Sequence, residues 1–425
     1  MIDIKLIREN PEKFQKAAVD KHFSVDIAKI LELDGQMRKL KSDLQDIVTE
    51  KNRIGKDIPR LKDDQKKEAL DTLAGLKTKE SKLDCDLREI TAEFDKLILF
   101  VPQPADDGVP LGKDDTENVE IRRVGTVREF DFKPKDHVEL GEILDIIDIE
   151  RGVRLAGTRN YFLKGDGAML HWAVLRFAID FMNTRGYTPM SVPLLMREEA
   201  MLGTGYFPGA EEQTYMLERD ELSLVGTAEV PLTAYYSGEI LNEEQLPIKM
   251  CAMSACFRRE AGSAGKDTRG LYRIHQFDKV EQVVICRNDI EESKKLHDEI
   301  LANSEGVLQA LELPYRVVNV CCGDLGKGQA QKYDIETWMP SRNGYGETHS
   351  ASRFYDFQAR RLNLRYKDAN KKNIFCHTLN NTVIASPRIL IPLLELYQNA
   401  DGSVTIPKVL RQYMGGKERI ESKKG

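Results

Sequence analysis

The sequence predicts an α+β protein, with an N-terminal antiparallel two-helix coiled-coil arm followed by a larger domain that contains a long antiparallel hairpin. Three observations support this fold class: two matching heptad patterns in the first hundred residues, a stretch rich in Pro, Gly and Asp at about 101–118, and two strand-like runs around a glycine-containing loop within 248–285. A chain of 425 residues is also too long for one ordinary core. We therefore expect two domains, 1–105 and 106–425.

The composition excludes several classes of protein. Charged residues make up 31% of the chain, and no apolar run approaches the ~20 residues that span a bilayer, so we expect no membrane partner. The N-terminus lacks the pattern of a secretory signal, and the seven cysteines are scattered without CxxC pairs, which favours a reducing, cytoplasmic location over a disulfide framework or zinc ribbon. A net charge of -6 means that an RNA partner would need a local basic patch.

Apolar residues recur at heptad spacing in two runs near the N-terminus. The first run extends over 27–54 and is interrupted by Lys51, and the second extends over 69–97 with Glu80 as its polar member. The members of the two runs pair about a common midpoint, so we expect an antiparallel helical hairpin with its turn around Pro59.

Basic residues surround this expected turn. They include Lys51, Arg53, Lys56, Arg60 and Lys62. Such a cluster is usually only the solvated end of a helical hairpin. It also suits the backbone of a folded RNA, where shape and phosphate contacts dominate recognition.

Anion-binding and aromatic residues concentrate in the stretch 257–281. They are Arg258, Glu260, Arg273, Phe277 and Glu281. The flanking runs, 248–257 and 272–285, are rich in apolar and β-branched residues, and the polar, turn-forming middle predicts a long antiparallel hairpin. Arginines on such a hairpin can meet phosphates. A charged hairpin containing glycines is equally typical of a solvated loop, and residue types alone leave both interpretations open.

The middle of this hairpin imitates a P-loop. Gly265 and Lys266 match the end of the GxxxxGK[ST] pattern, but Asp267 stands where Ser or Thr is required. Glu260 stands where the pattern requires its first Gly. A P-loop is therefore excluded.

Other segments of the larger domain have recognisable patterns. The spacing of apolar residues predicts helices over 168–184 and 289–311. A strand is expected over 187–195, where Pro189 and Pro193 restrict it to a sheet edge or an interface. A helix followed by such a strand suits a dimer contact.

Several polar residues sit where a pocket is expected. Thr227 and Glu229 follow a short apolar run and would face a pocket at the sheet edge, although Thr-Ala-Glu is also a good helix start with Thr as the N-cap. Glu347 and Ser350 carry oxygen donors of the kind that Mg²⁺ prefers beside phosphates. His349 between them has no partner at metal-ligand spacing, which favours a structural histidine over a zinc ligand.

The stretch 377–398 predicts a strand that runs into a helix. Arg388 stands at the expected helix N-terminus, where a positive charge is unfavourable for the helix dipole, so we expect it to need an anion. Pro392 falls within the same helix and should bend or loosen it.

Taken in order, these motifs resemble the seryl-tRNA synthetases of the bacterial type over essentially the whole chain. The segments that carry the resemblance are the two-helix arm, VPLGKDDTENVEIRR, GTAE, FRREAGSAGKDTRGLYRIHQFDKVE, ETHS with DFQARR, and TLNNTVIASPR. The resemblance implies a class II synthetase core, an antiparallel sheet flanked by helices, with 186–193 at a homodimer interface. It implies that ATP activates L-serine to seryl-adenylate, with Mg²⁺ as cofactor, and that the seryl group passes to tRNA(Ser); a selenocysteine tRNA is a further candidate partner.

The resemblance also implies roles for individual residues. For ATP, it implies Arg258 at the α-phosphate and substrate carboxylate, Glu260 at the adenine amino group, Arg273 at the outer phosphates, Phe277 beneath adenine and Arg388 on the other side of the triphosphate. It implies Glu347 and Ser350 as Mg²⁺ ligands, and a serine pocket of Thr227, Glu229, Arg258, Glu281 and Thr382, with Thr382 near the substrate hydroxyl. Among these, Arg258, Glu347 and Arg388 would be catalytic, and the arm would reach the long variable arm of tRNA(Ser).

Two other functions share part of this pattern. A serine-activating ligase that loads a carrier protein would have the same core without needing RNA, and the intact arm argues against it. A catalytically inactive relative that serves as a scaffold would have lost Arg258, Glu347 or Arg388, and all three are present.

Overall fold

The computed structural model describes residues 1–262, 265, 267 and 269–422, so Lys266 of the P-loop look-alike lies outside the described part. The chain separates into two compact units, Met1–Pro104 and Ala105–Gly425. None of the helices described here combines the length and the apolar character needed to cross a membrane.

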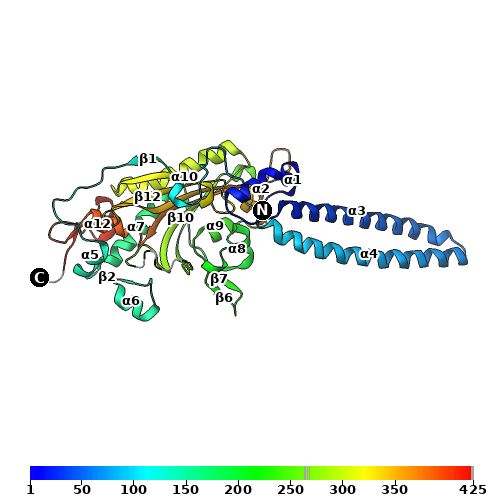
Figure 1. Cartoon of the computed structure of the whole chain (residues 1–425), viewed down its shortest axis with the longest axis horizontal. Coiled ribbons are helices and arrows are strands. Elements are labelled where there is room, and N and C mark those ends of the chain that lie inside the picture. The colour runs from blue at the N-terminus through cyan, green and yellow to red at the C-terminus, as the bar shows by residue number, and fades with distance from the viewer. Residues whose placement is uncertain (263–264, 266, 268, 423–425) are drawn as a thin grey trace. The chain divides into compact units, whose positions relative to one another are not determined.

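The first unit is helical (Figure 1). Short helices α1 (Ile4–Glu9) and α2 (Pro11–Asp20) precede the long helices α3 (Ile27–Asp57) and α4 (Asp63–Ile98), which lie side by side along their length. A short 3-10 turn at Ile58–Arg60 joins α3 to α4. The predicted helical hairpin and its turn around Pro59 are therefore confirmed.

The two polar members of the heptad patterns contact each other. Lys51 Nζ donates a hydrogen bond to Glu80 Oε2 at 2.6 Å, and only 30% and 23% of the two side chains are exposed. The neighbouring members Ile47 and Ile54 are buried. An ion pair within an apolar seam adds little net stability, but it disfavours any helix register that separates the two charges.

We predict that Glu80→Leu weakens the arm by about 0.5–1 kcal/mol, because Lys51 loses its partner in a partly buried position. The double variant Lys51→Met, Glu80→Leu should regain this loss, since apolar side chains then fill the seam. Hydrogen exchange of the α3 and α4 amides in the full chain measures the opening free energy of both variants. Unchanged exchange protection in Glu80→Leu would show that the ion pair contributes nothing.

The second unit is built on an eight-stranded sheet with the strand order β1-β11-β12-β13-β16-β10-β9-β4. All neighbours in this sheet are antiparallel except β4 and β9, which are parallel. The strands are β1 (Val119–Val124), β11 (Tyr315–Asn319), β12 (Gln331–Met339), β13 (Gly344–Tyr355), β16 (His377–Ser386), β10 (Gln276–Cys286), β9 (Ile248–Phe257) and β4 (Thr188–Met190).

Helices and short strands surround this sheet (Figure 1). The helices are α5 (His137–Ile143), α6 (Ile149–Ala156), α7 (Asp166–Thr184), α8 (Glu198–Thr204), α9 (Glu229–Ala234), α10 (Ile290–Ala310), α11 (Phe357–Arg361) and α12 (Leu390–Leu396). The short strands are β2 (Ile147–Asp148), β3 (Phe162–Leu163), β5 (Leu195–Arg197), β6 (Met216–Leu217), β7 (Leu222–Leu224), β8 (Ile240–Asn242), β14 (Arg365–Lys367), β15 (Asn373–Phe375), β17 (Val404–Thr405) and β18 (Arg419–Ile420).

The sheet has a hydrophobic core on each face. Val280 and Val284 of β10 pack with residues of α7, α10 and α12, whereas Val283 and Ile285 pack with residues of α9 and α11. Because successive side chains of a strand point to opposite faces, these two clusters lie on opposite sides of the sheet. The α+β class, with an antiparallel sheet flanked by helices, is therefore confirmed.

The central hairpin is confirmed with one change of boundary. β9 and β10 pair antiparallel from Phe257 opposite Gln276 to Ile248 opposite Ile285. The exit strand begins at Gln276 rather than at Tyr272, because the preceding residues contact other segments: the His275 N–H donates to the Arg159 carbonyl at 3.3 Å. The predicted helices over 168–184 and 289–311 are confirmed as α7 and α10.

Two proline-based expectations need correction. The strand expected over 187–195 is only the short β4, at the sheet edge as Pro189 predicts, and Leu195 begins the separate strand β5. Pro392 is the third residue of α12, in the first helical turn, where a backbone N–H has no acceptor within the helix. Its missing N–H therefore costs the helix nothing, and the predicted bend is not required.

Candidate active site

The predicted site residues come from four adjacent strands and the segments that follow them. Arg258 directly follows β9, Phe277 lies on β10, Glu347 lies on β13 and Thr382 lies on β16. These strands are neighbours in the sheet, so one pocket collects side chains from all of them. It is lined by the predicted residues Arg258, Glu260, Phe277, Glu347, Ser350, Thr382 and Arg388, together with Leu271, Tyr272, Ile274, Lys279, Thr348, His349 and Ala385.

One end of the pocket combines a cation with an aromatic ring. The guanidinium of Arg258 lies 5.2 Å from the centroid of the Phe277 ring. The backbone N–H of Arg258 donates to the His275 carbonyl at 2.9 Å, and its Nε donates to the Gly226 carbonyl at 3.4 Å. This end therefore holds a positive charge over one face of an aromatic ring.

Glu260 and Arg273 form an ion pair across the hairpin, with 2.8 Å between Arg273 Nη1 and Glu260 Oε2. Glu260 has a φ of 53°, a left-handed conformation that is uncommon for a residue other than Gly. Glu260 lines the pocket, and Arg273 lies beside it through this ion pair. The two residues expected at different parts of ATP are thus direct neighbours here.

Arg388 has several partners within the protein. Its Nε donates to the Tyr272 carbonyl at 3.1 Å, one Nη donates to the Glu347 carbonyl at 3.0 Å, and its guanidinium lies 4.4 Å from the centroid of the Tyr272 ring. The Glu347 carboxylate is 3.8 Å away. Because α12 begins only at Leu390, the expectation that Arg388 occupies a helix N-terminus is wrong, and its contact with an anion stays a prediction.

A β-bulge brings Glu347 and Ser350 to the same pocket. His349 lies opposite Ile335 and Glu347 lies opposite Glu336, so Thr348 is an extra residue in β13. In a regular strand, residues three apart point to opposite faces. The bulge changes this alternation, and both oxygen-bearing side chains line the pocket.

Nearby charges and burial give the carboxyl groups of Glu347 and Asp334 different pKa values. Desolvation within the pocket raises the pKa of Glu347, but the positive charges of Arg388, Lys332 and Arg258 outweigh it and hold the pKa below its ordinary value, although half of the side chain is exposed. Asp334 lies opposite Ser350 in the sheet. Burial raises the pKa of Asp334 to about 7. The negative charge of Glu347 adds to this increase, and the positive charge of Lys332 opposes it. Glu347 is therefore the carboxylate that stays ionised.

The donor set is compatible with a magnesium ion that binds together with phosphates. Among the residues described, no group of three or more His, Cys, Asp or Glu side chains could hold a metal ion by itself. Glu347 and Ser350 supply two oxygen donors, and Mg²⁺ usually takes one or two carboxylates while substrate phosphates and water fill the remaining positions.

The other end of the pocket holds a chain of buried polar groups. Lys279 forms an ion pair with Glu281 and donates to Thr382 Oγ1 at 3.4 Å. Thr382 Oγ1 in turn donates to Glu281 Oε2 at 3.4 Å. The sequence analysis missed Lys279, yet strand alternation places Phe277, Lys279 and Glu281 on one face of β10, and this signal would have found it.

Thr227 and Glu229 lie at the start of α9 and are not among the described residues that line the pocket. The Glu229 N–H donates to Thr227 Oγ1 at 3.1 Å, but the N-cap of α9 is Ala228, so the expectation that Thr227 is the N-cap is wrong. Glu229 is buried, and its Oε1 accepts a hydrogen bond from the Gln358 amide at 2.8 Å. Burial, with a contribution from the charge of Glu281, raises the pKa of Glu229 to about 7.

His349 fits the structural interpretation. Its Nδ1 lies 2.8 Å from Thr348 Oγ1, and burial lowers its pKa to about 3. The ring is therefore neutral at physiological pH.

The basic residues of the arm divide into two groups. Lys51 pairs with Glu80, and Arg53 pairs with Glu50 at 2.6 Å. The three residues closest to the turn, Lys56, Arg60 and Lys62, are exposed.

Comparison with known proteins agrees with this architecture. Residues 1–104 match the seryl-tRNA synthetase N-terminal domain, and residues 215–397 match the tRNA synthetase class II core domain (G, H, P, S and T). A serine–tRNA ligase from Deinococcus radiodurans is 49% identical over 418 residues, which cover 98% of each chain.

Solved structures are similar over the same extent. The crystal structure of seryl-tRNA synthetase from Pyrococcus horikoshii complexed with ATP is 38% identical, with a TM-score of 0.93, and the match covers 99% of this chain and 100% of that one. The cytoplasmic serine–tRNA ligase from Naegleria fowleri in complex with AMP is 33% identical, with a TM-score of 0.89, over 100% of this chain and 99% of that one. Because these similarities extend over nearly every residue, the chain belongs to the seryl-tRNA synthetases, which activate serine with ATP as seryl-adenylate and transfer the seryl group to tRNA.

Proposed function

We propose that the pocket formed by β9, β10, β13 and β16 binds ATP and serine next to each other, and that Arg258, Glu347 and Arg388 are the catalytic residues of serine activation in this chain. The observation that carries this proposal is that these three charged side chains line one pocket although they come from distant parts of the sequence. Displacement at phosphorus requires positioning and neutralisation of developing charge, and a side-chain nucleophile is not needed.

In this proposal, ATP lies along the hairpin. Phe277 stacks beneath adenine, and Glu260 accepts a hydrogen bond from the adenine amino group. Arg258 holds the α-phosphate and the serine carboxylate, while Arg388 and Arg273 face the outer phosphates. The 5.2 Å approach of Arg258 to Phe277 supports this assignment, because a base and its α-phosphate need an aromatic surface and a cation at such close range.

Magnesium is the proposed cofactor, held by Glu347 and Ser350 together with ATP phosphates. When bound, the ion neutralises phosphate charge. The low pKa of Glu347 supports the assignment, because an ionised carboxylate is the form that binds a cation.

The serine site is proposed at the buried polar end, where Thr382 lines the pocket, and we include Thr227, Glu229 and Glu281, which are not among the lining residues. Thr382 lies within a hydrogen-bonded chain with Lys279 and Glu281, and a site that hydrogen-bonds the serine hydroxyl strongly rejects alanine. Glu281 is already paired with the charged Lys279, whereas Glu229 accepts hydrogen bonds from the neutral amides of Gln358 and Asn380. We therefore assign the serine ammonium group to Glu229.

Catalysis then proceeds in two steps. A serine carboxylate oxygen attacks the α-phosphorus, the bond to the pyrophosphate breaks, and Arg258 neutralises the charge that develops at the α-phosphate. A hydroxyl oxygen of the terminal tRNA ribose next attacks the seryl carbonyl, the bond between this carbonyl and the AMP phosphate breaks, and the hydroxyl proton leaves with AMP. No side chain forms a covalent bond with the substrate in either step.

The partners of the chain complete the proposal. The residues around the arm turn contact the backbone of tRNA(Ser), with a selenocysteine tRNA as a further candidate. The chain forms a homodimer through the β4 edge, and the exposed apolar side chains of Met169 and Trp172 on α7 and Met253 on β9 support this interface. Location in the cytoplasm stays a prediction.

Arg258→Ala should reduce serine-dependent exchange of pyrophosphate into ATP about 100-fold or more, because the α-phosphate loses its positive partner. The matched control is Arg259→Ala, since Arg259 is adjacent and exposed and donates only to the Glu212 carbonyl, at 3.3 Å, among its described side-chain contacts. Both variants should sediment as dimers of the natural mass, and exchange by the natural chain should stop when EDTA removes Mg²⁺. Full exchange activity in Arg258→Ala would refute the proposed site.

The KM for serine should rise about tenfold between pH 8 and pH 6, because Glu229, with a pKa of about 7, loses the negative charge that holds the ammonium group as the pH falls. Serine itself keeps its ammonium charge throughout this range. Pyrophosphate exchange at several pH values measures the effect. Glu229→Gln should show a high KM that no longer changes with pH; a variant with the natural pH profile would assign the titration to another group.

Reversing the charges of Lys56, Arg60 and Lys62 to Glu should raise the KM for tRNA(Ser) about tenfold or more and leave pyrophosphate exchange unchanged, because phosphate contacts dominate RNA affinity. The comparison variant reverses Lys77, Lys79 and Lys82, which are exposed on the middle of α4. Aminoacylation of tRNA(Ser) and of a selenocysteine tRNA measures both. An effect confined to the second triple variant would move the RNA contact away from the turn. If the chain were instead a serine-activating ligase that loads a carrier protein, it would aminoacylate no tRNA.

A further inference from the structure

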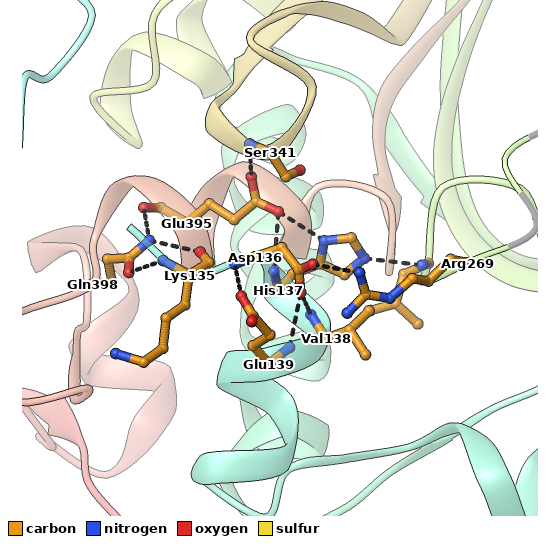
Figure 2. Close-up of polar contacts among 10 residues, drawn as sticks. Lys135, Asp136, His137, Val138, Glu139, Arg269, Ser341, Glu395 and Gln398 are labelled. Carbon is orange, nitrogen blue, oxygen red and sulfur yellow. Dashed lines mark hydrogen bonds and ion pairs between the residues drawn. The ribbon is translucent and has the colours of Figure 1, made fainter. Parts of the chain in front are cut away.

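A buried histidine–carboxylate pair lies outside the pocket and connects three segments that lead into it (Figure 2). His137 is the first residue of α5, and Glu395 lies on α12 with none of its surface exposed. Their side chains meet at 2.7 Å, between His137 Nδ1 and Glu395 Oε1. The two residues are far apart in the sequence, so this contact joins separate parts of the second unit.

Glu395 gathers donors from two segments. Its Oε1 also accepts the backbone N–H of His137 at 3.0 Å, and its Oε2 accepts the backbone N–H of Ser341 at 2.9 Å. Figure 2 shows the carboxylate between Ser341 and the His137 ring. A buried carboxylate with these donors is satisfied as an anion.

The same contacts define the state of the His137 ring. Because Nδ1 faces a carboxylate oxygen, it carries the proton and donates, which leaves Nε2 as an acceptor. Nε2 accepts the backbone N–H of Leu271 at 3.2 Å. His137 therefore bridges Glu395 and the segment at the end of the hairpin loop.

Two further features hold this segment against α5. Gly270 has a φ of 83°, and a Cβ at this position would lie 2.2 Å from His137 Nε2, so only glycine permits the approach. Arg269 forms an ion pair with Asp136 at 2.9 Å, and Asp136 is also the N-cap of α5.

Each connected segment carries part of the pocket. Leu271 lines it, and the next residue, Tyr272, contacts Arg388 through its carbonyl and its ring. Arg388 lies just before α12, the helix of Glu395. Ser341 lies in the 3-10 turn Pro340–Arg342, which precedes β13, the strand of Glu347.

We propose that His137 is a positioning residue for ATP binding. It holds the Leu271–Tyr272 backbone at a fixed distance from Glu395, and Tyr272 in turn fixes the position of Arg388. The proposal rests on the proposed ATP site. The acceptor at Nε2 separates this positioning role from a merely structural one. A structural role would need only the Nδ1 donor to the buried Glu395 carboxylate.

Two matched variants separate these roles. In His137→Asn, the amide lies at the place of Nδ1, so it keeps the donor to Glu395 and loses the acceptor for Leu271. In His137→Gln, the amide reaches the place of Nε2, so it keeps an acceptor for Leu271. Pyrophosphate exchange by the full chain gives KM for ATP, KM for serine and kcat, and thermal unfolding reports stability.

We expect His137→Asn to unfold near the natural temperature with its KM for ATP raised about tenfold and its KM for serine unchanged, because misplacing a phosphate-binding segment by a fraction of an ångström weakens only ATP binding. His137→Gln should restore most of the ATP affinity. A natural KM for ATP in His137→Asn, or equal rises in both KM values, would overturn the proposal.

Gly270→Ala provides an independent variant if His137→Asn does not fold. It keeps His137 but pushes the ring and the Leu271 segment apart, and it should raise the KM for ATP in the same way; an unchanged KM would overturn the proposal. Loss of exchange in Arg258→Ala supports the ATP site separately. A failure of the His137 prediction is therefore distinct from a failure of the proposed function.

Discussion

Antiparallel pairing on both sides of β10 is the constraint on which the pocket depends. β10 is bonded to β9 from Gln276 to Ile285 and to β16 from Asp278 to Cys286. A strand held on both edges cannot shift register without turning its buried side chains over. Phe277 and Glu281 are four residues apart on one face and thus roughly 13 Å apart along the strand, a spacing that suits a nucleotide base at one end and an amino acid at the other.

Charge is distributed unevenly along this face. Arg258 and Arg388 supply positive charge where phosphates are proposed, and Glu347 remains ionised among them. At the other end, Glu229 has a pKa of about 7 because it is buried and close to Glu281. Two carboxyl groups of the same residue type thus have different ionisation states, because one is surrounded by cations and the other lies next to a second acid.

Local patterns in the sequence predict the elements that local contacts form. The arm follows from heptad spacing, and the hairpin follows from two strand-like runs around a polar loop, because periodicity is a property of neighbouring residues. The shared pocket of Glu347 and Ser350 could not be predicted in this way, since the bulge at Thr348 appears only when β13 pairs with β12. The resemblance to the family implied both residues as ligands, but it did not explain how their side chains come to line the same pocket. His137 and Glu395 carry no signal at all, because their contact depends on how distant segments pack.

The two units differ in the kind of contact that forms their functional parts. In the arm, the Lys51–Glu80 ion pair joins α3 to α4, the two helices of one hairpin. In the second unit, Arg388 binds the carbonyls of Tyr272 and Glu347, which belong to distant segments of the chain. Serine activation therefore requires the packing of distant segments of the second unit, whereas the proposed contact with the tRNA backbone would require only the helical hairpin and its exposed charges. A change at the arm turn should therefore alter transfer to tRNA and spare activation, whereas a change in the pocket should alter both steps, because both take place there.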